Sequence, residues 1–280
     1  MRFDFLHPRE ESRKPYGQRV LVDDREVRVT SPDRVLVDGV TKAAALEYFL
    51  AVGDGILGAL RDRPVMLERR RDDTVFFQRR LPQGAPEWVA TVRGTEYDLV
   101  CPDDLATVAW MVNLGAVTFH PWPVRRDAMH TPDRLLIDLD PQAGTGFEEA
   151  VAVARMVREV LHERELEGFP KTSGGRGLHI LVPLATPQPW GDVQALREGI
   201  GHEVVERIPE LATMRRLKRD RGARVYLDCG PQTVASAYSI GPGGLVSAPL
   251  RWEELDIVSP RDFDVASMPE RFARIGDLAP

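Results

Sequence analysis

The stretch RLLIDLDP, residues 134–141, decides how the rest of the chain is interpreted. Its aliphatic residues predict a buried β-strand, yet the strand also contains Asp138 and Asp140. Because side chains alternate along a strand, both carboxylates lie on one face, about 7 Å apart. An unpaired buried carboxylate costs several kcal/mol, so folding alone does not favour two of them. The pattern therefore predicts a cation shared by the two aspartates.

A second acidic strand strengthens this prediction. In RVYLD, residues 224–228, alternation places Asp228 on the same face as Tyr226, at the end of the strand. A third carboxylate would allow two divalent ions to be held together, the arrangement that aligns an in-line phosphoryl displacement. Oxygen ligands without His or Cys favour Mg²⁺ or Mn²⁺ over Zn²⁺.

A glycine-rich stretch, KTSGGRGLHI at 171–180, is the third feature. We expect a flexible loop that leads into a strand, in which backbone N–H groups and the Ser173 hydroxyl bind phosphate oxygens and Arg176 adds positive charge. His179 points away from the aliphatic side of that strand. The stretch is not a Walker loop, because the spacing and the terminal Lys-Ser/Thr pair are absent.

Each of these signals has a simpler interpretation when taken alone. A DxD pair also occurs in glycosyltransferases, phosphatases and polymerases, or as surface carboxylates paired with arginine. Asp228 alone could cap a turn, and an isolated histidine is more often structural. From the residues themselves, a Mn²⁺-dependent glycosyltransferase therefore remains an alternative, although it leaves the glycine loop and Asp228 unexplained.

The remaining sequence predicts an α+β protein with a largely antiparallel sheet, organised as one domain over residues 1–280 with an N-terminal extension of roughly 1–24. Strands are expected at 25–30, 65–69, 74–80, 177–184, 224–228 and 233–240, with 65–80 forming a hairpin. Helices are expected at 42–60 after a Thr41 cap, at 103–116 with Asp103 or Asp104 as cap, and at 147–165 and 192–208.

Composition restricts the class of protein without identifying it. The chain has no apolar run long enough to span a bilayer, no signal-peptide pattern, and only Cys101 and Cys229, so we expect a cytoplasmic protein without disulfides or a membrane partner. The net charge of −6 argues against a polyanionic partner, yet residues 214–226 carry six basic residues and one acid. The composition is therefore also compatible with a basic surface patch on an acidic molecule.

The whole chain resembles the polymerase domain of bacterial ligase D and its stand-alone relatives, within the archaeo-eukaryotic primase superfamily. The matching strings occur in order: VTSPDRVLV, VTKAAALEYF, FFQRR, NLGAVTFHPWPVR, PDRLLIDLDP, FPKTSGGRGLHILVPL, RVYLD, TVASAYS and VSAPLRWEEL. This resemblance implies a primase-polymerase fold, with an RRM-like catalytic core flanked by helices and an N-terminal α/β lobe. It also implies template-directed addition of nucleotides, often ribonucleotides, to DNA 3′ ends in double-strand-break end joining or gap repair.

The resemblance also implies roles for individual residues. Asp138, Asp140 and Asp228 would hold two Mn²⁺ or Mg²⁺ ions, and His120, Ser173, Arg176 and His179 would contact the incoming nucleoside triphosphate. Phe76 and Phe77 would stack on its base or sugar, and Lys42, Lys218 and Arg221 would contact phosphates. The implied partners are DNA with gaps or 3′ overhangs, Ku and an ATP-dependent DNA ligase, in the cytoplasm at the nucleoid.

The chain departs from the family pattern in three places. The segment between LERR and FFQ is shorter than usual. Gly241 stands where relatives carry an arginine after the Tyr-Ser pair, and the segment 229–232 is shorter than usual. These departures leave an alternative of another class, a weakened or inactive polymerase fold that binds DNA ends within a repair complex.

Overall fold

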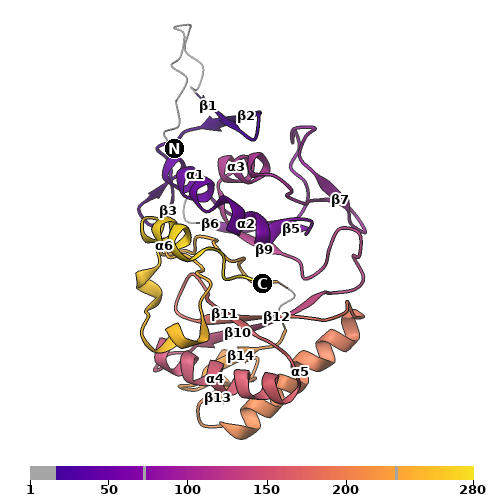
Figure 1. Ribbon diagram of the computed structural model, residues 1–280, viewed down its shortest axis with the longest axis vertical. Coiled ribbons are helices and arrows are strands. Elements are labelled where there is room, and N and C mark those ends of the chain that lie inside the picture. The colour runs from indigo at the N-terminus through magenta and orange to yellow at the C-terminus, as the bar shows by residue number, and fades with distance from the viewer. Residues whose placement is uncertain (1–16, 72–73, 231–232) are drawn as a thin grey trace, which may run out of the picture.

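Two five-stranded sheets organise the part of the chain that the computed structural model describes, residues 17–71, 74–230 and 233–280 (Figure 1). One sheet lies in the N-terminal half of the chain and the other carries the acidic strands. Apart from one parallel pair, all neighbouring strands in both sheets are antiparallel. The predicted α+β class with a largely antiparallel sheet is therefore confirmed.

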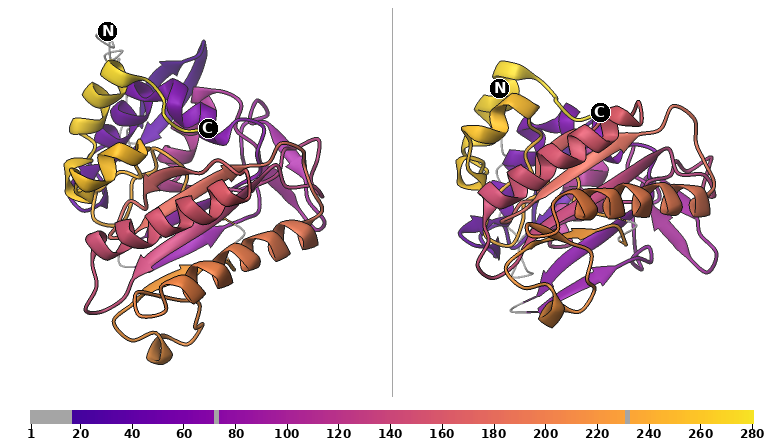
Figure 2. Two further views of the ribbon diagram at one scale, coloured as in Figure 1. Left: turned by 60° about the horizontal axis from the view of Figure 1, so that its bottom comes forward. Right: turned by 90° about the horizontal axis from the view of Figure 1, so that it is seen from below.

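The acidic sheet has the strand order β11-β12-β10-β14-β13. These strands are β11 (Phe169–Thr172), β12 (Leu178–Pro183), β10 (Arg134–Pro141), β14 (Val225–Asp228) and β13 (Ala212–Thr213). Helices α4 (Phe147–Glu163) and α5 (Trp190–Arg207) lie side by side along one face of it (Figure 2). The aliphatic side chains of β10, Leu135, Ile137 and Leu139, are buried in the core. The acidic face points the other way, because side chains alternate.

The N-terminal half begins with the hairpin of β1 (Gly17–Val22) and β2 (Arg25–Thr30). Strand β1 thus occupies part of the predicted N-terminal extension, whose residues 1–16 lie outside the described residues. The five-stranded sheet of this half is built from β5 (Val65–Arg71), β6 (Thr74–Gln78), β7 (Thr91–Arg93), β8 (Asp98–Val100) and β9 (Ala116–Pro121). Strands β5 and β6 form the predicted hairpin.

Two helix caps predicted from the sequence are present. After the short pair β3 (Val35–Val37) and β4 (Val40–Thr41), the Thr41 side chain accepts a hydrogen bond from the Ala44 N–H at 3.2 Å and starts α1 (Lys42–Ala51). Asp104, rather than Asp103, accepts from the Thr107 N–H at 2.7 Å and starts α3 (Leu105–Asn113). Both side chains satisfy backbone donors that have no partner inside the helix.

The predicted helix 42–60 is two helices. Helix α1 ends at Ala51, and α2 (Gly53–Leu60) continues at 86° to it. A Cβ on Gly55 would lie 2.6 Å from the Tyr238 ring, so the absence of a side chain lets α2 pack directly on that tyrosine. By length and composition this bent pair could form a broken membrane span, whereas no single helix among the described residues is long and apolar enough to cross a bilayer.

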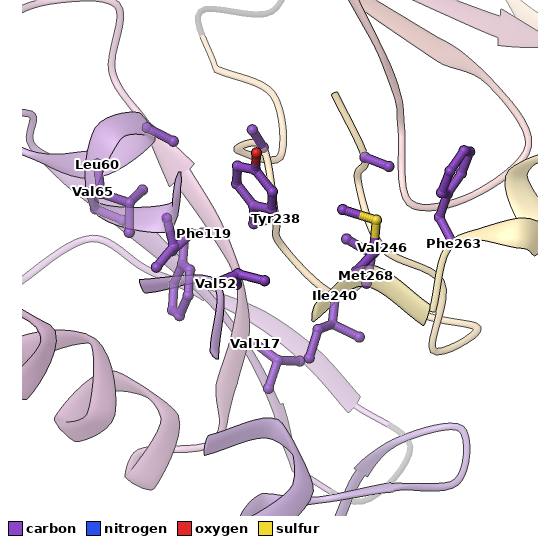
Figure 3. Close-up of a cluster of buried hydrophobic side chains, with 14 of the residues drawn as sticks. Val52, Leu60, Val65, Val117, Phe119, Tyr238, Ile240, Val246, Phe263 and Met268 are labelled. Atoms are coloured by element: carbon purple, nitrogen blue, oxygen red, sulfur yellow. The ribbon is translucent and has the colours of Figure 1, made fainter. Parts of the chain in front are cut away.

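The predicted strand 233–240 is wrong. This segment donates backbone hydrogen bonds from Ser236 to Phe119 and from Ile240 to Val117 of β9, but its one bridge pairs Ile240 with Val246. Tyr238 has φ +65°, a left-handed conformation that interrupts an extended run. Figure 3 shows Tyr238 and Ile240 beside Phe119 and Val117 in the buried core.

The C-terminal residues close over the boundary between the two halves. They contain the short helical turns η2 (Trp252–Asp256) and η3 (Pro260–Asp262) and the helix α6 (Ser267–Ile275). Phe272 of α6 packs edge-on against Tyr238 with the ring centroids 5.4 Å apart. One hydrophobic cluster includes residues of both sheets, such as Phe119 and Ile137. A single domain over 1–280 stays a prediction.

Candidate active site

Four polar side chains form one row across four strands of the acidic sheet. In the strand register, Lys171 of β11 pairs with His179 of β12, His179 with Asp138 of β10, and Asp138 with Asp228 of β14. Directly opposite residues have their Cβ atoms about 4.5–5.5 Å apart. The three predicted metal-binding carboxylates are therefore brought together, because Asp140 follows Asp138 on the same face and lies opposite Tyr226.

The three aspartates lie close enough for their charges to affect one another. Burial, followed by the charges of Asp140 and Asp228, raises the pKa of Asp138 to about 7. Carboxylate oxygens are the donors that Mg²⁺ and Mn²⁺ favour, and either ion would relieve this repulsion. In the described part of the chain, however, no three His, Cys, Asp or Glu side chains are already gathered in a metal-binding geometry.

Two of the carboxylates accept hydrogen bonds from groups two residues further along the chain. Asp228 accepts a hydrogen bond from the Gly230 N–H at 2.7 Å, and Asp140 accepts one from the Gln142 side chain at 2.9 Å. The donor chemistry and the strand register fit a divalent cation.

The glycine loop forms one wall of a pocket that also contains two of these aspartates. A cavity of about 280 Å³ is lined by Asp138, Asp140, Ser173, Arg176, His179, Leu139, Pro242 and the glycines 174, 175 and 177. Ser173 closes the loop, since its N–H donates to the Gly177 carbonyl at 3.0 Å and its Oγ accepts from the Gly177 N–H at 3.2 Å. Arg176 donates to the Pro141 carbonyl at 3.2 Å. The loop thus presents backbone, hydroxyl and cationic donors next to the carboxylates.

The prediction of a loop beginning at residue 171 needs one correction. Lys171 and Thr172 belong to strand β11, and the loop comprises only the residues between β11 and β12. A Cβ on Gly177 would lie 2.2 Å from the Leu139 carbonyl oxygen, and Gly174 has φ +78°. Only glycine fits these two positions, so the loop passes directly over β10.

Sequence reasoning missed Lys171 and Ser247. Lys171 is only 2% exposed, and its Nζ lies 2.6 Å from His179 Nδ1 and 2.5 Å from Ser247 Oγ. Burial lowers the pKa of Lys171 to about 7. The signal that could have found Lys171 is strand alternation, had FPKT been taken as a strand that precedes the loop. Ser247 carries no such signal, because its contact depends on a segment 76 residues away.

His120 and Phe77 are brought together on the N-terminal sheet, whereas Phe76 lies on the opposite face of β6, where Arg69 packs over its ring at 5.2 Å. The His120 ring lies edge-on to Phe77 at 5.4 Å, and its Nε2 is 3.2 Å from a carboxylate oxygen of Glu68, a partner the sequence did not reveal. Phe77 is 52% exposed although it is a large apolar side chain. Burial, then the charges of Lys171 and His120, hold the pKa of His179 well below its usual value, so His120 lies within electrostatic range of the pocket.

The three basic residues predicted to contact phosphates lie in different surroundings. Arg221 packs over the Tyr226 ring at 3.4 Å and lies 3.9 Å from Asp140, beside the row. Lys218 is exposed on the short turn η1 (Lys218–Asp220). Lys42 is buried, and its Nζ donates to the carbonyls of Thr30 and Asn113 at 2.5 and 2.9 Å. The contacts of Lys42 give its predicted phosphate role no support.

Gly241 approaches the glycine loop closely. A Cβ at this position would lie 1.9 Å from the Gly174 carbonyl oxygen, and the Gly241 N–H donates to the Leu245 carbonyl at 2.7 Å. An arginine cannot occupy this position unless the loop backbone moves. Of the short segment 229–232, residues 231 and 232 lie outside the described residues.

Comparison with known proteins identifies the family of the chain. The family model described as LigD, primase-polymerase domain, matches residues 41–279. The chain belongs to this family. The resemblance inferred from the sequence motifs is therefore confirmed, and the primase-polymerase fold with it.

Individual relatives of this LigD polymerase-family chain are end-joining proteins. It is 31% identical, over 91% of its length, to the multifunctional non-homologous end joining DNA repair protein LigD of Mycobacterium tuberculosis, and 28% identical, over 95%, to that of Mycolicibacterium smegmatis. The chain covers 37% of the length of each relative. The polymerase domain of M. tuberculosis ligase D, solved in complex with DNA, superimposes with a TM-score of 0.81 at 29% identity, covering 90% of this chain and 96% of that one.

Proposed function

We propose that this chain is a template-directed nucleotidyltransferase that adds nucleotides, ribonucleotides among them, to DNA 3′ ends in double-strand-break end joining or gap repair. The observation that carries the proposal is the row of Asp138 and Asp228 with Asp140, beside the pocket of the glycine loop. Family membership over residues 41–279 supports the same reaction class.

Within this proposal, the three aspartates hold two divalent ions, Mn²⁺ or Mg²⁺. Bound there, the ions supply positive charge to the attacking 3′ oxygen and to the phosphates. Asp138 and Asp140, which line the pocket, and Asp228, directly opposite Asp138, would be the residues that hold them.

The residues around the pocket orient the nucleoside triphosphate. Ser173, Arg176 and His179 line the cavity next to the aspartates and present hydroxyl, guanidinium and imidazole donors to phosphate oxygens. His120 and the exposed Phe77 supply an aromatic surface for the base or sugar. The exposed Lys218 contacts phosphates at the side of β14, and Arg221, bonded to the Arg215 and Arg216 carbonyls, lies beside Asp140.

The proposed partners follow from the relatives. A solved structural relative is a complex with DNA, and the similar full-length proteins are named for non-homologous end joining. We therefore propose DNA with gaps or 3′ overhangs as the substrate. Ku and an ATP-dependent DNA ligase, which the resemblance of the sequence motifs implies, are proposed to act at the same break. Action at the nucleoid in the cytoplasm belongs to this proposal.

Primer extension tests the reaction. Gapped and overhanging DNA is incubated with NTPs or dNTPs and with Mn²⁺ or Mg²⁺, and templated incorporation is measured. The Asp138→Ala, Asp140→Ala double variant is expected to lose at least about 1,000-fold in rate, because several kcal/mol of charge stabilisation disappears.

Asp127→Ala, an exposed aspartate outside the row, is the matched control and is expected to retain the wild-type rate. Full activity in the double variant contradicts the proposal. Binding of DNA without any incorporation by the wild-type chain supports instead the alternative of a DNA-end-binding module.

A further inference from the structure

Lys171 lies at the end of the polar row, and the proposed reaction gives it no role. The side chain is 2% exposed, and among the described residues no carboxylate lies within ion-pair distance of it. A buried amine of this kind is costly for folding when an aliphatic side chain of similar volume could take its place. Its position next to His179 suggests a function instead.

The hydrogen bonds around Lys171 fix which atoms carry hydrogen. The Ser247 hydroxyl donates its one hydrogen to the Thr172 carbonyl at 2.7 Å, so Ser247 Oγ can only accept from Lys171 Nζ at 2.5 Å. The remaining short contact of Nζ is His179 Nδ1 at 2.6 Å, whereas the Thr172 carbonyl is 3.5 Å away. The charged amine has three N–H bonds and no lone pair, so it donates to both close acceptors and accepts from neither.

His179 Nδ1 therefore accepts, and its proton resides on Nε2. Nε2 lies on the pocket side of the ring, 3.5 Å from Asp138 Oδ1, and His179 lines the cavity of the glycine loop. In the opposite tautomer, Nε2 would be an acceptor facing both the carboxylates and the phosphates, which are acceptors themselves. The contact with Lys171 decides between these two states.

The segment 246–248 keeps Lys171 in place. Thr172 Oγ1 donates to the Val246 carbonyl at 2.8 Å and accepts from the Ala248 N–H at 2.8 Å, so β11 is bonded to this segment on both sides of Ser247. Thr172 and Ser247 are fully buried. The amine is thus held between two rigid pieces of backbone and aimed at the imidazole.

We propose that Lys171 is a positioning residue that fixes His179 as the Nε2–H tautomer, so that Nε2 donates to a phosphate oxygen of the incoming nucleotide. The donation step rests on the proposed nucleotidyltransferase function, whereas the tautomer does not. Lys171 itself does not contact the substrate and acts through His179.

The tautomer can be measured on the protein without nucleotide or metal. In ¹⁵N-labelled protein, long-range ¹H–¹⁵N correlation spectra distinguish a protonated ring nitrogen from an unprotonated one, and a His179→Gln variant assigns the signals. The wild type is expected to show protonated Nε2 and unprotonated Nδ1. A wild-type spectrum with protonated Nδ1 overturns the proposal, even if no variant folds.

Lys171→Met removes both N–H donors while keeping the length of the chain, and it is expected to give a mixture of tautomers or the Nδ1–H form. Ser247→Ala is the matched control, because it removes the other partner of Lys171 and leaves the bond to His179 intact. It is expected to retain the Nε2–H form. An unchanged tautomer in Lys171→Met contradicts the inference.

Kinetics separate positioning from a general loss of structure. In primer extension, Lys171→Met is expected to raise the KM for the nucleotide by about 10- to 100-fold, as loss of a strong hydrogen bond to a charged group does. Added to His179→Gln it should cause no further loss, because Lys171 acts through that ring. Additive losses contradict the proposal. Absence of extension by the wild type would contradict the proposed function but not the tautomer result.

Discussion

Gly241 and Gly174 show how a single backbone contact shapes the pocket. The Gly174 carbonyl lies so close to Gly241 that no side chain fits between them, and Gly174 itself has φ +78°. The loop that carries Ser173 and Arg176 is consequently supported from below by the chain at 241. An arginine side chain at position 241 would collide with the Gly174 backbone and displace the loop. The glycine at 241 is therefore required by the close packing of this loop.

Gly241→Ala is therefore expected to destabilise the protein by about 1–3 kcal/mol, as overpacking of a rigid site does, and to weaken nucleotide binding. Urea denaturation and nucleotide titration measure the two effects. Gly243→Ala is the matched control, since nothing lies within 4 Å of the added methyl group. Equal stability of the two variants contradicts this account.

At the scale of elements, the start of β10 is held by an ion pair that precedes the acidic residues. Arg63, only 1% exposed, forms two hydrogen bonds with Asp133 at 2.8 and 2.7 Å. This pair joins the chain between α2 and β5 to the residue before Arg134, where β10 begins. Burial acts to raise the pKa of Asp133, but the hydrogen bonds and charge of Arg63 outweigh it, and the pKa lies below its usual value.

Asp133→Ala is expected to cost about 3–5 kcal/mol of unfolding free energy, because it leaves the Arg63 guanidinium buried without its partner. Urea denaturation at neutral pH measures the loss. Asp98→Ala is the matched control: its partner Arg93 is 69% exposed, and surface pairs of this kind contribute about 0–1 kcal/mol. A small effect at Asp133 would contradict the structural role of the pair.

The same pair predicts a pH dependence. Since the pKa of Asp133 is lower in the folded state, its contribution to stability is complete above the ordinary carboxyl pKa of about 4 and disappears as the pH falls through the folded value. The wild type is expected to lose stability more steeply than Asp133→Asn in acid. Parallel stability curves for the two proteins between neutral and acidic pH contradict this sign.

At the scale of the whole molecule, an acidic chain with net charge −6 is proposed to bind DNA. Local charge resolves this conflict, because residues 214–226 carry a net charge of +5 beside the Asp228 strand, with six basic residues against one acid. After Trp252 the charge is reversed, with seven acids and three arginines. Residues 214–226 are expected to attract a polyanion such as DNA, and the acidic residues after Trp252 are expected to repel it.

Lys218→Ala with Arg219→Ala is expected to weaken DNA binding and to reduce the slope of log Kd against log salt by about 0.9 for each phosphate that the variant no longer neutralises. Both side chains are exposed. Arg274→Ala, an exposed arginine in the acidic C-terminal region, is the control and is expected to leave the slope unchanged. Titrations at several salt concentrations measure both, and equal slopes contradict the assignment of the basic segment.

The sequence by itself determined the features that follow from local chemistry. Alternation placed Asp138 and Asp140 on one strand face, small polar residues marked the caps at Thr41 and at Asp103 or Asp104, and ordered motifs identified the family. Each of these signals depends on residues that are close together in the chain, so it can be recognised in the sequence alone. The bend after Ala51 and the left-handed Tyr238 are not local in this sense, because each depends on what packs against it.

Only the tertiary structure decided which residues meet across elements. It placed Lys171, His179, Asp138 and Asp228 in one row because four strands distant in sequence share a single register. It turned Lys42 into a buried donor to carbonyl groups, and Ser247 into a partner of Lys171. Hydrogen-bond partners of buried groups depend on distances between segments, and those distances are set by packing rather than by the order of residues.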